Sequence, residues 1–325
     1  MLPPMAIFFP LFTLLEDLGY LPRIAFNMDK TFQKCTACGK QALTMCMGFG
    51  CNACGVIGAR IIDSPRERLI AILTNSFVPC NGRFPAMISI ISMFLVGNCT
   101  GIISSLKGVL ILLFVILLGI FMTFVSSKLL SKTLLKGESS SFTLELPPYR
   151  VPKIGSTIIR SIFDRTLFVL GRAAIVALPT GIVIWLLANI NIYDVSILTH
   201  ITNFLDPFAK IIGLDGVLLT AFILGFPANE IVIPIAMMAY TLSGELEQMN
   251  NLIEIKNVLI LNGWTINTAI CTIIFSLMHW PCSTTCLTIL KETKSKKWTL
   301  ISMVLPTICG MIICAAITFI YNIFT

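Results

Sequence analysis

The sequence predicts an all-α polytopic membrane protein whose two related halves contain discontinuous or re-entrant helices. Composition predicts the class, because hydrophobic residues make up 56% of the 325 positions, charged residues only 12%, and the mean hydropathy is +0.90. A soluble domain usually carries roughly 25% charged residues. Interrupted apolar segments and an internal repeat predict the architecture. Because a polytopic membrane protein spans the lipid bilayer, we expect the bilayer to be one of its partners.

Three apolar segments are typical of ordinary transmembrane helices. Residues 108–125 are apolar throughout and nearly long enough alone to cross a hydrocarbon core of about 30 Å. Residues 166–188 carry one charge, Arg172, and the helix-disturbing Pro179. Residues 298–324 form the third segment.

Three further apolar segments are interrupted by glycine, proline or polar residues. Residues 69–96, 217–240 and 257–290 are each broken, the last at the HWPC stretch, 279–282. Non-helical backbone at membrane depth is tolerated only where it is buried in protein or lines a wet cavity. Many transporters build their sites from such broken helices, so we expect functional groups at these interruptions.

An internal repeat connects the broken segments. The sequence GFGCN at 48–52 returns as GFPAN at 225–229, and each copy is followed by a Pro-Cys pair, at 79–80 and at 281–282. The intervals differ, so the repeat is not a strict tandem one, and chance similarity of a pentapeptide is the alternative. Two linked elements in the same order favour duplication.

Basic residues predict the topology. Residues 128–165 and 291–297 are rich in lysine and arginine, so both should be cytoplasmic, whereas residues 189–216 should be external. These clusters hold much of the net charge of +7, so we expect no nucleic-acid partner. Three apolar segments separate the two basic loops. An odd number of crossings would place the loops on opposite sides of the membrane, although both should be cytoplasmic. One broken segment must therefore be re-entrant or cross twice, and 217–240 is the preferred one.

Glu230 is an acid between apolar neighbours in GFPANEIVIP. A charged side chain at this depth costs at least ~2–3 kcal/mol, which makes an intramembrane acid a candidate functional residue. A coordinated metal ion would offset that cost. The alternatives are a structural ion pair, for example with Arg172, and protonation of the carboxylate.

Cys51, Cys80 and Cys282 each stand at a glycine- or proline-broken position. Thiolates suit ferrous iron, copper and zinc and are poor ligands for magnesium or calcium. A single membrane cysteine is more often a small apolar filler. Three cysteines at three helix breaks predict a metal path.

Two Cys-x-x-Cys pairs, Cys35/Cys38 and Cys51/Cys54, are separated by twelve residues. This spacing suggests a four-thiolate knuckle. Such a knuckle needs both pairs in one compact, mostly aqueous hairpin, whereas the spacer TMCMGFG is apolar. We therefore prefer a path lined by separate cysteines to a knuckle.

Four other residues are weaker candidate metal ligands. For each of them packing or a local hydrogen bond is the alternative, and for the asparagines this means capping a broken helix end. These residues are Met47, Asn52, Asn229 and His279. The sequence contains no G-x-x-x-x-G-K-[ST] phosphate loop, no G-x-G-x-x-G after a strand and no catalytic triad pattern. We therefore expect no enzyme activity and no bound nucleotide.

Several motifs together resemble the membrane region of the ferrous iron transport protein B family. In chain order they are EDLGYLPRIAFNMD (16–29), MGFGCN (47–52), SPRERL (64–69), PCNGRFP (79–85), ELPPYRVP (145–152), GFPANE (225–230) and WPCSTT (280–285). In that family two gate segments of the nucleoside-recognition type flank a core segment. The resemblance implies a first gate segment at 1–100, truncated at its N-terminus, and a core segment with the basic cytoplasmic loop at 101–165. It further implies a second gate segment at 166–290, and a basic loop with the last helix at 291–325.

The resemblance implies a ferrous iron importer of the bacterial plasma membrane with a cysteine-lined path, Fe2+ being the transported substrate. Cys51, Cys80 and Cys282 match cysteines of the family motifs, and Glu230 matches the acid of the second gate. Asn229 stands where many members have lysine. Cys35, Cys38 and Cys54 match nothing in the family pattern.

Family members normally begin with a cytosolic small-GTPase domain, which this sequence does not contain. The partners considered are therefore a separate small-GTPase domain, small cytosolic iron-transport proteins and further copies of the chain. Two other functions stay open. One is transport of a nucleoside or another organic solute through gate-type segments, and the other is a non-transporting fragment or assembly partner.

Overall fold

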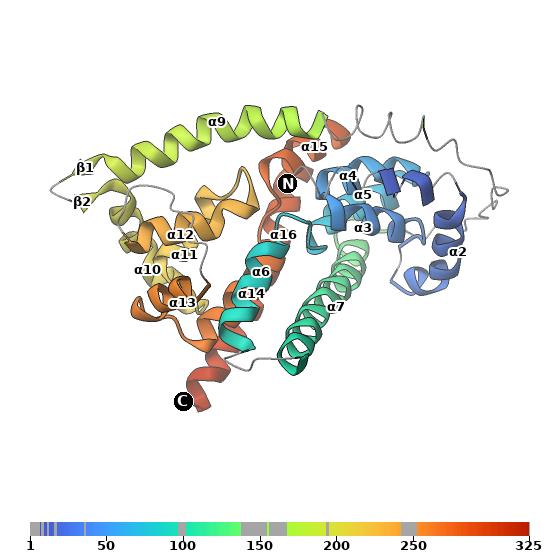
Figure 1. Ribbon diagram of the computed structural model, residues 1–325. Helices are drawn as coiled ribbons and strands as arrows, with labels where there is room; N and C mark the ends of the chain where they lie inside the picture. Colours follow the sequence, from blue (N-terminus) through green and yellow to red (C-terminus); the bar gives the residue numbers. More distant parts are fainter. Residues whose placement is uncertain are drawn as a thin grey trace. The chain divides into compact units, whose positions relative to one another are not determined.

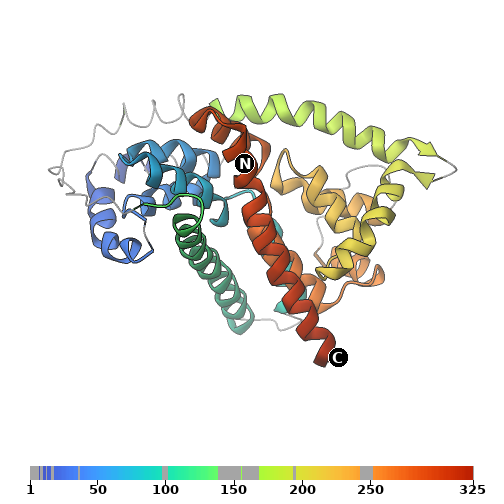
Figure 2. The same cartoon turned by 180° about the vertical axis from the view of Figure 1, so that it is seen from behind.

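The computed structural model describes residues 18–35, 37–96, 102–137, 168–192, 195–241 and 252–324, together with Ile7, Pro10, Leu11, residues 13–15 and Gly155. Helices dominate this part of the chain (Figure 1; Figure 2 from behind), which confirms the predicted all-α class. The helices up to the middle of the chain are α2 (Tyr20–Gln33), α3 (Gln41–Gly50), α4 (Asn52–Gly58), η1 (Ala59–Ile61), α5 (Pro65–Thr74), η2 (Asn75–Phe77), α6 (Phe84–Ile90), the π-helical η3 (Ile91–Leu95), α7 (Ile102–Lys132) and α9 (Phe168–Asn189).

A short antiparallel hairpin follows α9, formed by β1 (Asn191–Ile192) and β2 (Val195–Ser196). The remaining helices are α10 (Ile197–Ile211), α11 (Gly216–Leu224), η5 (Asn229–Ile231), α12 (Val232–Thr241), α13 (Leu252–Leu261), α14 (Ile266–Met278), α15 (Ser283–Thr293) and α16 (Lys296–Phe324).

The chain divides into two compact units, each built from three separated stretches. Unit 1 comprises Met1–Asn81, Leu118–Ala174 and Thr284–Val304, and unit 2 comprises Gly82–Leu117, Ile175–Ser283 and Leu305–Thr325. The two helix breaks of the first repeat, at 48–52 and 78–81, lie in unit 1. Both breaks of the second repeat lie in unit 2.

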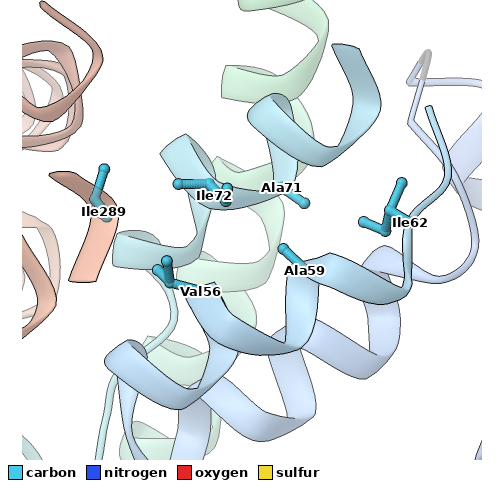
Figure 3. Packing of buried hydrophobic residues seen from close by; sticks show 6 residues of the cluster. All are labelled: Val56, Ala59, Ile62, Ala71, Ile72 and Ile289. Carbon is cyan, nitrogen blue, oxygen red and sulfur yellow. The ribbon is translucent and has the colours of Figure 1, made fainter. Parts of the chain in front are cut away.

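Small and branched apolar side chains form the core of unit 1. One cluster joins α4, η1, α5 and α15 (Figure 3), and its members are Val56, Ala59, Ile62, Ala71, Ile72 and Ile289. The alanines let the short helices approach closely, and the branched residues fill the space between them. In a second cluster, Phe32 of α2 packs edge-on against Phe124 of α7, with ring centroids 4.9 Å apart. Within unit 1, this cluster packs the part of α7 from Leu118 onward against α2 and α3.

Helix α5 begins where the sequence SPRE predicts a helix start. The Ser64 side chain accepts a hydrogen bond from the backbone N–H of Glu67, and Pro65 occupies the first helical position. Proline is favoured there because it has no N–H to leave unpaired. This cap fixes the direction in which α5 leads into the break at 78–81.

In unit 2, α10 and α11 form a pair bent by 108°. The bend is stabilised by Gly213, whose φ of +71° is in the left-handed region, and by Asp215, which accepts a hydrogen bond from Leu218 N–H at 2.7 Å. Helix α10 was not expected in the segment 189–216, which the sequence analysis treated as an external connection. Its residues alternate between polar and apolar faces and include Pro207, so no uniformly apolar run marked it.

Three helical segments of the described chain are long and apolar enough to cross a membrane, namely Ile102–Lys132, Ile266–Thr293 and Lys296–Phe324. Counting the bent pair of α10 and α11 as one span gives a fourth. The predicted helices at 108–125, 166–188 and 298–324 correspond to α7, α9 and α16. The sharp bend overlaps the segment 217–240 only through α11, so its re-entrance stays a prediction.

Candidate functional site

The first break of the first repeat separates α3 from α4, which lie side by side in unit 1 (Figure 1). Cys51 is extended there, with φ −153° and ψ 124°. The Asn52 amide, turned as its hydrogen bonds require, donates to Gly48 O at 3.0 Å and to Val78 O at 3.1 Å. Asn52 therefore closes the break through backbone carbonyls, which is the capping role considered for it.

The second break of the first repeat, after η2, lies against the first break. Asn81 N–H donates to Gly50 O at 3.4 Å, and the Asn75 side-chain amide donates to Asn52 O at 2.9 Å. Because Asn81 follows Cys80 and Gly50 precedes Cys51, the two predicted cysteines stand on neighbouring backbone segments of unit 1. The sequence alone showed only that both stood at breaks.

The second repeat has the same construction in unit 2. Ala228 takes the place of Cys51 and has nearly the same backbone angles, φ −150° and ψ 115°. Ser283 follows the second Pro-Cys pair as Asn81 follows the first, and its N–H donates to Phe226 O at 2.9 Å. Each repeat therefore joins its G-F-x-x-N break to the residue after Pro-Cys. This agreement confirms the predicted pair of gate-type repeats.

Cys282 and Glu230 belong to these two breaks of unit 2. Ser283, next to Cys282, also donates its hydroxyl to Pro227 O at 3.4 Å, three residues before Glu230. Glu230 is half-buried in η5. In the part of the chain that the structure describes, its carboxylate makes no hydrogen bond and no ion pair; the side chain of Arg172 is outside that part.

His279 is buried, with 1% of its surface exposed. Its Nδ1 lies 3.1 Å from Phe275 O and 2.9 Å from Ser276 O, and its Nε2 lies 3.3 Å from the Asn229 amide. Both ring nitrogens thus face oxygen acceptors, since the Asn229 atom beside Nε2 is the amide oxygen Oδ1. His279 therefore joins the two breaks of unit 2, and Nε2 is available to a metal only if the Asn229 amide turns away.

Met47 packs in unit 1 against Gly58, where its sulfur lies in the space that a β-carbon would occupy. It belongs to a buried cluster with Ala25 and Leu43. Packing thus accounts for this side chain in the present arrangement, and its role as a ligand stays a prediction.

Arg83 is a residue whose role the sequence analysis missed. It entered the sequence analysis only within the motif PCNGRFP at 79–85, yet its side chain is fully buried in unit 2. Nη1 donates to Leu277 O at 2.6 Å, and Nη2 donates to His279 O at 3.1 Å and to Trp280 O at 3.2 Å. Arg83 thereby caps the carbonyl end of α14. A charged residue inside an apolar segment was the signal that could have revealed it.

The cysteines of the knuckle alternative have different surroundings. Cys38 lies in the loop before α3, where burial raises the pKa of its thiol to about 11. Without a bound metal it is therefore a thiol at neutral pH. The thiol of Cys51 interacts most strongly with Cys54, which follows it by three residues. Among the described residues, no three or more His, Cys, Asp or Glu side chains are placed to hold one metal ion.

A polar cavity of about 320 Å³ lies in unit 2 between α10, α11, α12 and α13. Its lining includes Asp206, Asp215 and Tyr240. The Tyr240 hydroxyl donates to Asp215 and accepts a hydrogen bond from Trp264 Nε1 at 2.8 Å. The Asp206 carboxylate pairs with Lys210 at 2.5 Å. The carboxylates are thus held by partners within the unit.

Comparisons with known proteins agree with this construction. Residues 112–164 match the family described as ferrous iron transport protein B C terminus. Residues 1–94 and 170–296 match the gate family described as nucleoside recognition. No solved structure matches the chain.

Three similar curated proteins carry the name Fe(2+) transporter FeoB. The one from Staphylococcus aureus (strain MSSA476) is 32% identical, over 96% of this chain and 45% of its own length. The one from Leptospira interrogans (strain Fiocruz L1-130) is 27% identical, over 94% of this chain and 46% of its own. The one from Methanocaldococcus jannaschii is 27% identical, over 99% of this chain and 47% of its own. This chain spans about half the length of these relatives. It belongs to the ferrous iron transport protein B family and matches the multi-pass membrane part of it.

Proposed function

We propose that the protein is the permeation unit of a ferrous iron importer in the plasma membrane. The observation that carries this proposal is the placing of cysteines at paired helix breaks, with Cys51 and Cys80 in unit 1 and Cys282 in unit 2. Thiolates favour ferrous iron over magnesium and calcium. The names of the relatives support the same substrate.

In this mechanism iron loses part of its water shell at the breaks and is bound by sulfur in turn. Cys51 and Cys80 bind it in unit 1, and Cys282 and Glu230 bind it in unit 2. The Glu230 carboxylate supplies negative charge, which offsets the cost of a divalent ion in an apolar region. Asn52, Asn229 and His279 hold the broken backbone in place, and binding must be weak enough for the ion to leave.

The energy for gating comes from elsewhere in this proposal. The chain binds no nucleotide and catalyses no reaction, and a small-GTPase domain controls the opening. Small cytosolic iron-transport proteins and further copies of the chain are the other proposed partners. The length of the relatives beyond the matched region is consistent with such a domain.

Replacing Cys51, Cys80 and Cys282 together by serine should reduce anaerobic Fe2+ uptake into proteoliposomes to the level of protein-free vesicles. Serine keeps the size of each side chain but is a much weaker ligand for ferrous iron than a thiolate. The measurement is uptake of radiolabelled iron by wild type and variant, after circular dichroism has shown equal helix content.

The matched control replaces Cys46 and Cys309 by serine, since both are half-buried cysteines away from the breaks. This double variant should transport like wild type. Normal uptake by the triple variant would disprove the mechanism. No uptake by the wild type from folded protein would favour a non-transporting fragment or assembly partner.

A second candidate function is transport of a nucleoside or another organic solute. The nucleoside-recognition match and the polar cavity in unit 2 favour it, because such solutes need hydrogen-bonding and aromatic groups. Uptake of radiolabelled uridine in the same vesicles separates the two. Uridine uptake that iron does not inhibit would support this function, and iron uptake that uridine does not inhibit would support the first.

A further inference from the structure

We propose that Cys54 is a second sulfur ligand at the first helix break, so that Cys51 and Cys54 bind one ferrous ion as a pair. This inference rests on the proposed function and adds a residue to it. Cys54 corresponds to nothing in the family motifs quoted above. Its position three residues after Cys51 places it at the first helix break.

The backbone brings the two sulfurs together. Cys51 is extended at the break, and the chain turns into α4 directly after it, with Cys54 N–H donating to Cys51 O at 3.0 Å. Cys54 is the group that interacts most strongly with the Cys51 thiol, so the two side chains are neighbours at the break. Cys51 is buried and Cys54 is half-buried. One turn of backbone at the break therefore carries both cysteines.

This spacing fits two bonds to one metal ion. Ligands about 2.3 Å from a tetrahedral ion lie roughly 3.8 Å apart, and Cys-x-x-Cys is a common source of two such ligands. On binding, the two thiols release their protons and the ion takes their place.

Charge balance favours the pair over one cysteine. A divalent ion with two thiolates has no net charge, whereas an ion on one thiolate keeps a positive charge that is costly in an apolar region. The amide oxygen of Asn75 lies beside the same helix break. It is buried and has no hydrogen bond within the described residues. That oxygen lies close to Gly55, the residue after Cys54.

Two sulfurs are also suited to an ion that must leave. A closed site with four sulfur ligands holds its metal permanently, and conduction requires binding that is weak enough for release. In the second repeat, Ala228 and Ile231 stand at the positions of Cys51 and Cys54, and Glu230 stands at the position of Ala53. The duplicated breaks thus provide different ligands, sulfur in the first and a carboxylate in the second.

The experiment titrates purified full chain in detergent with Cd2+, a non-oxidising probe for thiolates, and records the sulfur-to-metal charge-transfer absorbance. Cys54→Ser should weaken the tightest binding step at least about tenfold, because losing a direct sulfur ligand costs no less than losing an outer-shell partner, which costs about 10–100-fold. Cys51→Ser should do the same. The double variant should lose the charge-transfer band of that step, because neither sulfur of the pair remains.

The control is Cys46→Ser, a half-buried cysteine of α3, which should leave that step unchanged. A measurement on wild type avoids any folding defect of the variants. Cd2+ added before N-ethylmaleimide should protect Cys51 and Cys54 together, as read by peptide mass spectrometry. A Cys54→Ser titration like that of wild type, or protection of Cys51 alone, would overturn the proposal.

Iron uptake distinguishes this inference from the proposed function. If wild type takes up no iron while Cys54→Ser still weakens Cd2+ binding, the transport function fails and the ligand pair stands. If wild type takes up iron and Cys54→Ser matches it in both assays, the pair fails and the transport function stands.

Discussion

Replacing Arg83 by methionine will lower the free energy of unfolding by about 3 kcal/mol or more. The guanidinium donates to three carbonyl oxygens at the end of α14, those of Leu277, His279 and Trp280. Methionine fills the space but donates nothing, and each buried carbonyl left without a donor costs about 1 kcal/mol or more. The measurement is unfolding in mixed micelles titrated with sodium dodecyl sulfate, followed by tryptophan fluorescence.

Arg60→Met is the matched control for this variant. Arg60 makes a two-pronged ion pair with Glu292 at 2.8 and 2.6 Å, but its side chain is 63% exposed. An exposed pair contributes about 1 kcal/mol or less, so the control should stay close to wild type. Equal stabilities for the two variants would mean that water replaces the Arg83 guanidinium at the carbonyls.

Replacing Gly216 by alanine will destabilise unit 2 by about 3 kcal/mol, the upper end of the range for overpacking. Gly216 begins α11 at the bend with α10, and an added β-carbon there would meet backbone atoms of Thr202 and Asp206, at 2.9 Å from Asp206 N and 3.0 Å from its Cα. Backbone in a packed helix pair cannot shift as a flexible side chain can. The same micelle titration measures the loss.

Gly181→Ala in α9 is the control, because nothing lies within 4 Å of a β-carbon at Gly181. Alanine in an uncrowded helix position stabilises by about 0.5–1 kcal/mol relative to glycine. The two identical substitutions should therefore change stability in opposite directions. A neutral Gly216→Ala variant would show that α10 and α11 can separate without loss.

Local chemistry made the broken helices predictable. Proline and glycine cannot continue a helix without cost, so the breaks after α3, η2, α11 and α14 could be placed from the sequence. The repeat could be found because both copies keep the residues that make the break. Helix α10 escaped notice because its mixed faces and Pro207 resemble a surface connection, and the bend with α11 depends on packing.

The candidate site was also predictable only in part, because the contacts that assemble it depend on packing. The sequence identified Cys51, Cys80, Cys282 and Glu230 as unusual residues at breaks, and their role as metal ligands stays a prediction. It could not show that Asn81 bonds to Gly50 or that Ser283 bonds to Phe226, because these contacts form between segments far apart in the chain. Cys54 was set aside for lack of a family counterpart, although its position three residues after Cys51 is visible in the sequence.

The partners of Arg83 also have a consequence for synthesis of the protein. Its nearest acceptor, Leu277 O, is 194 residues further along the chain. At about 5–20 residues per second, the ribosome needs roughly 10–40 s to reach that residue. During this interval the Arg83 guanidinium lacks its acceptor carbonyls, although its segment later becomes part of an apolar interior, where a charge is costly. The first repeat should therefore stay near the membrane surface or beside the insertion machinery until α14 emerges, and insertion should finish late.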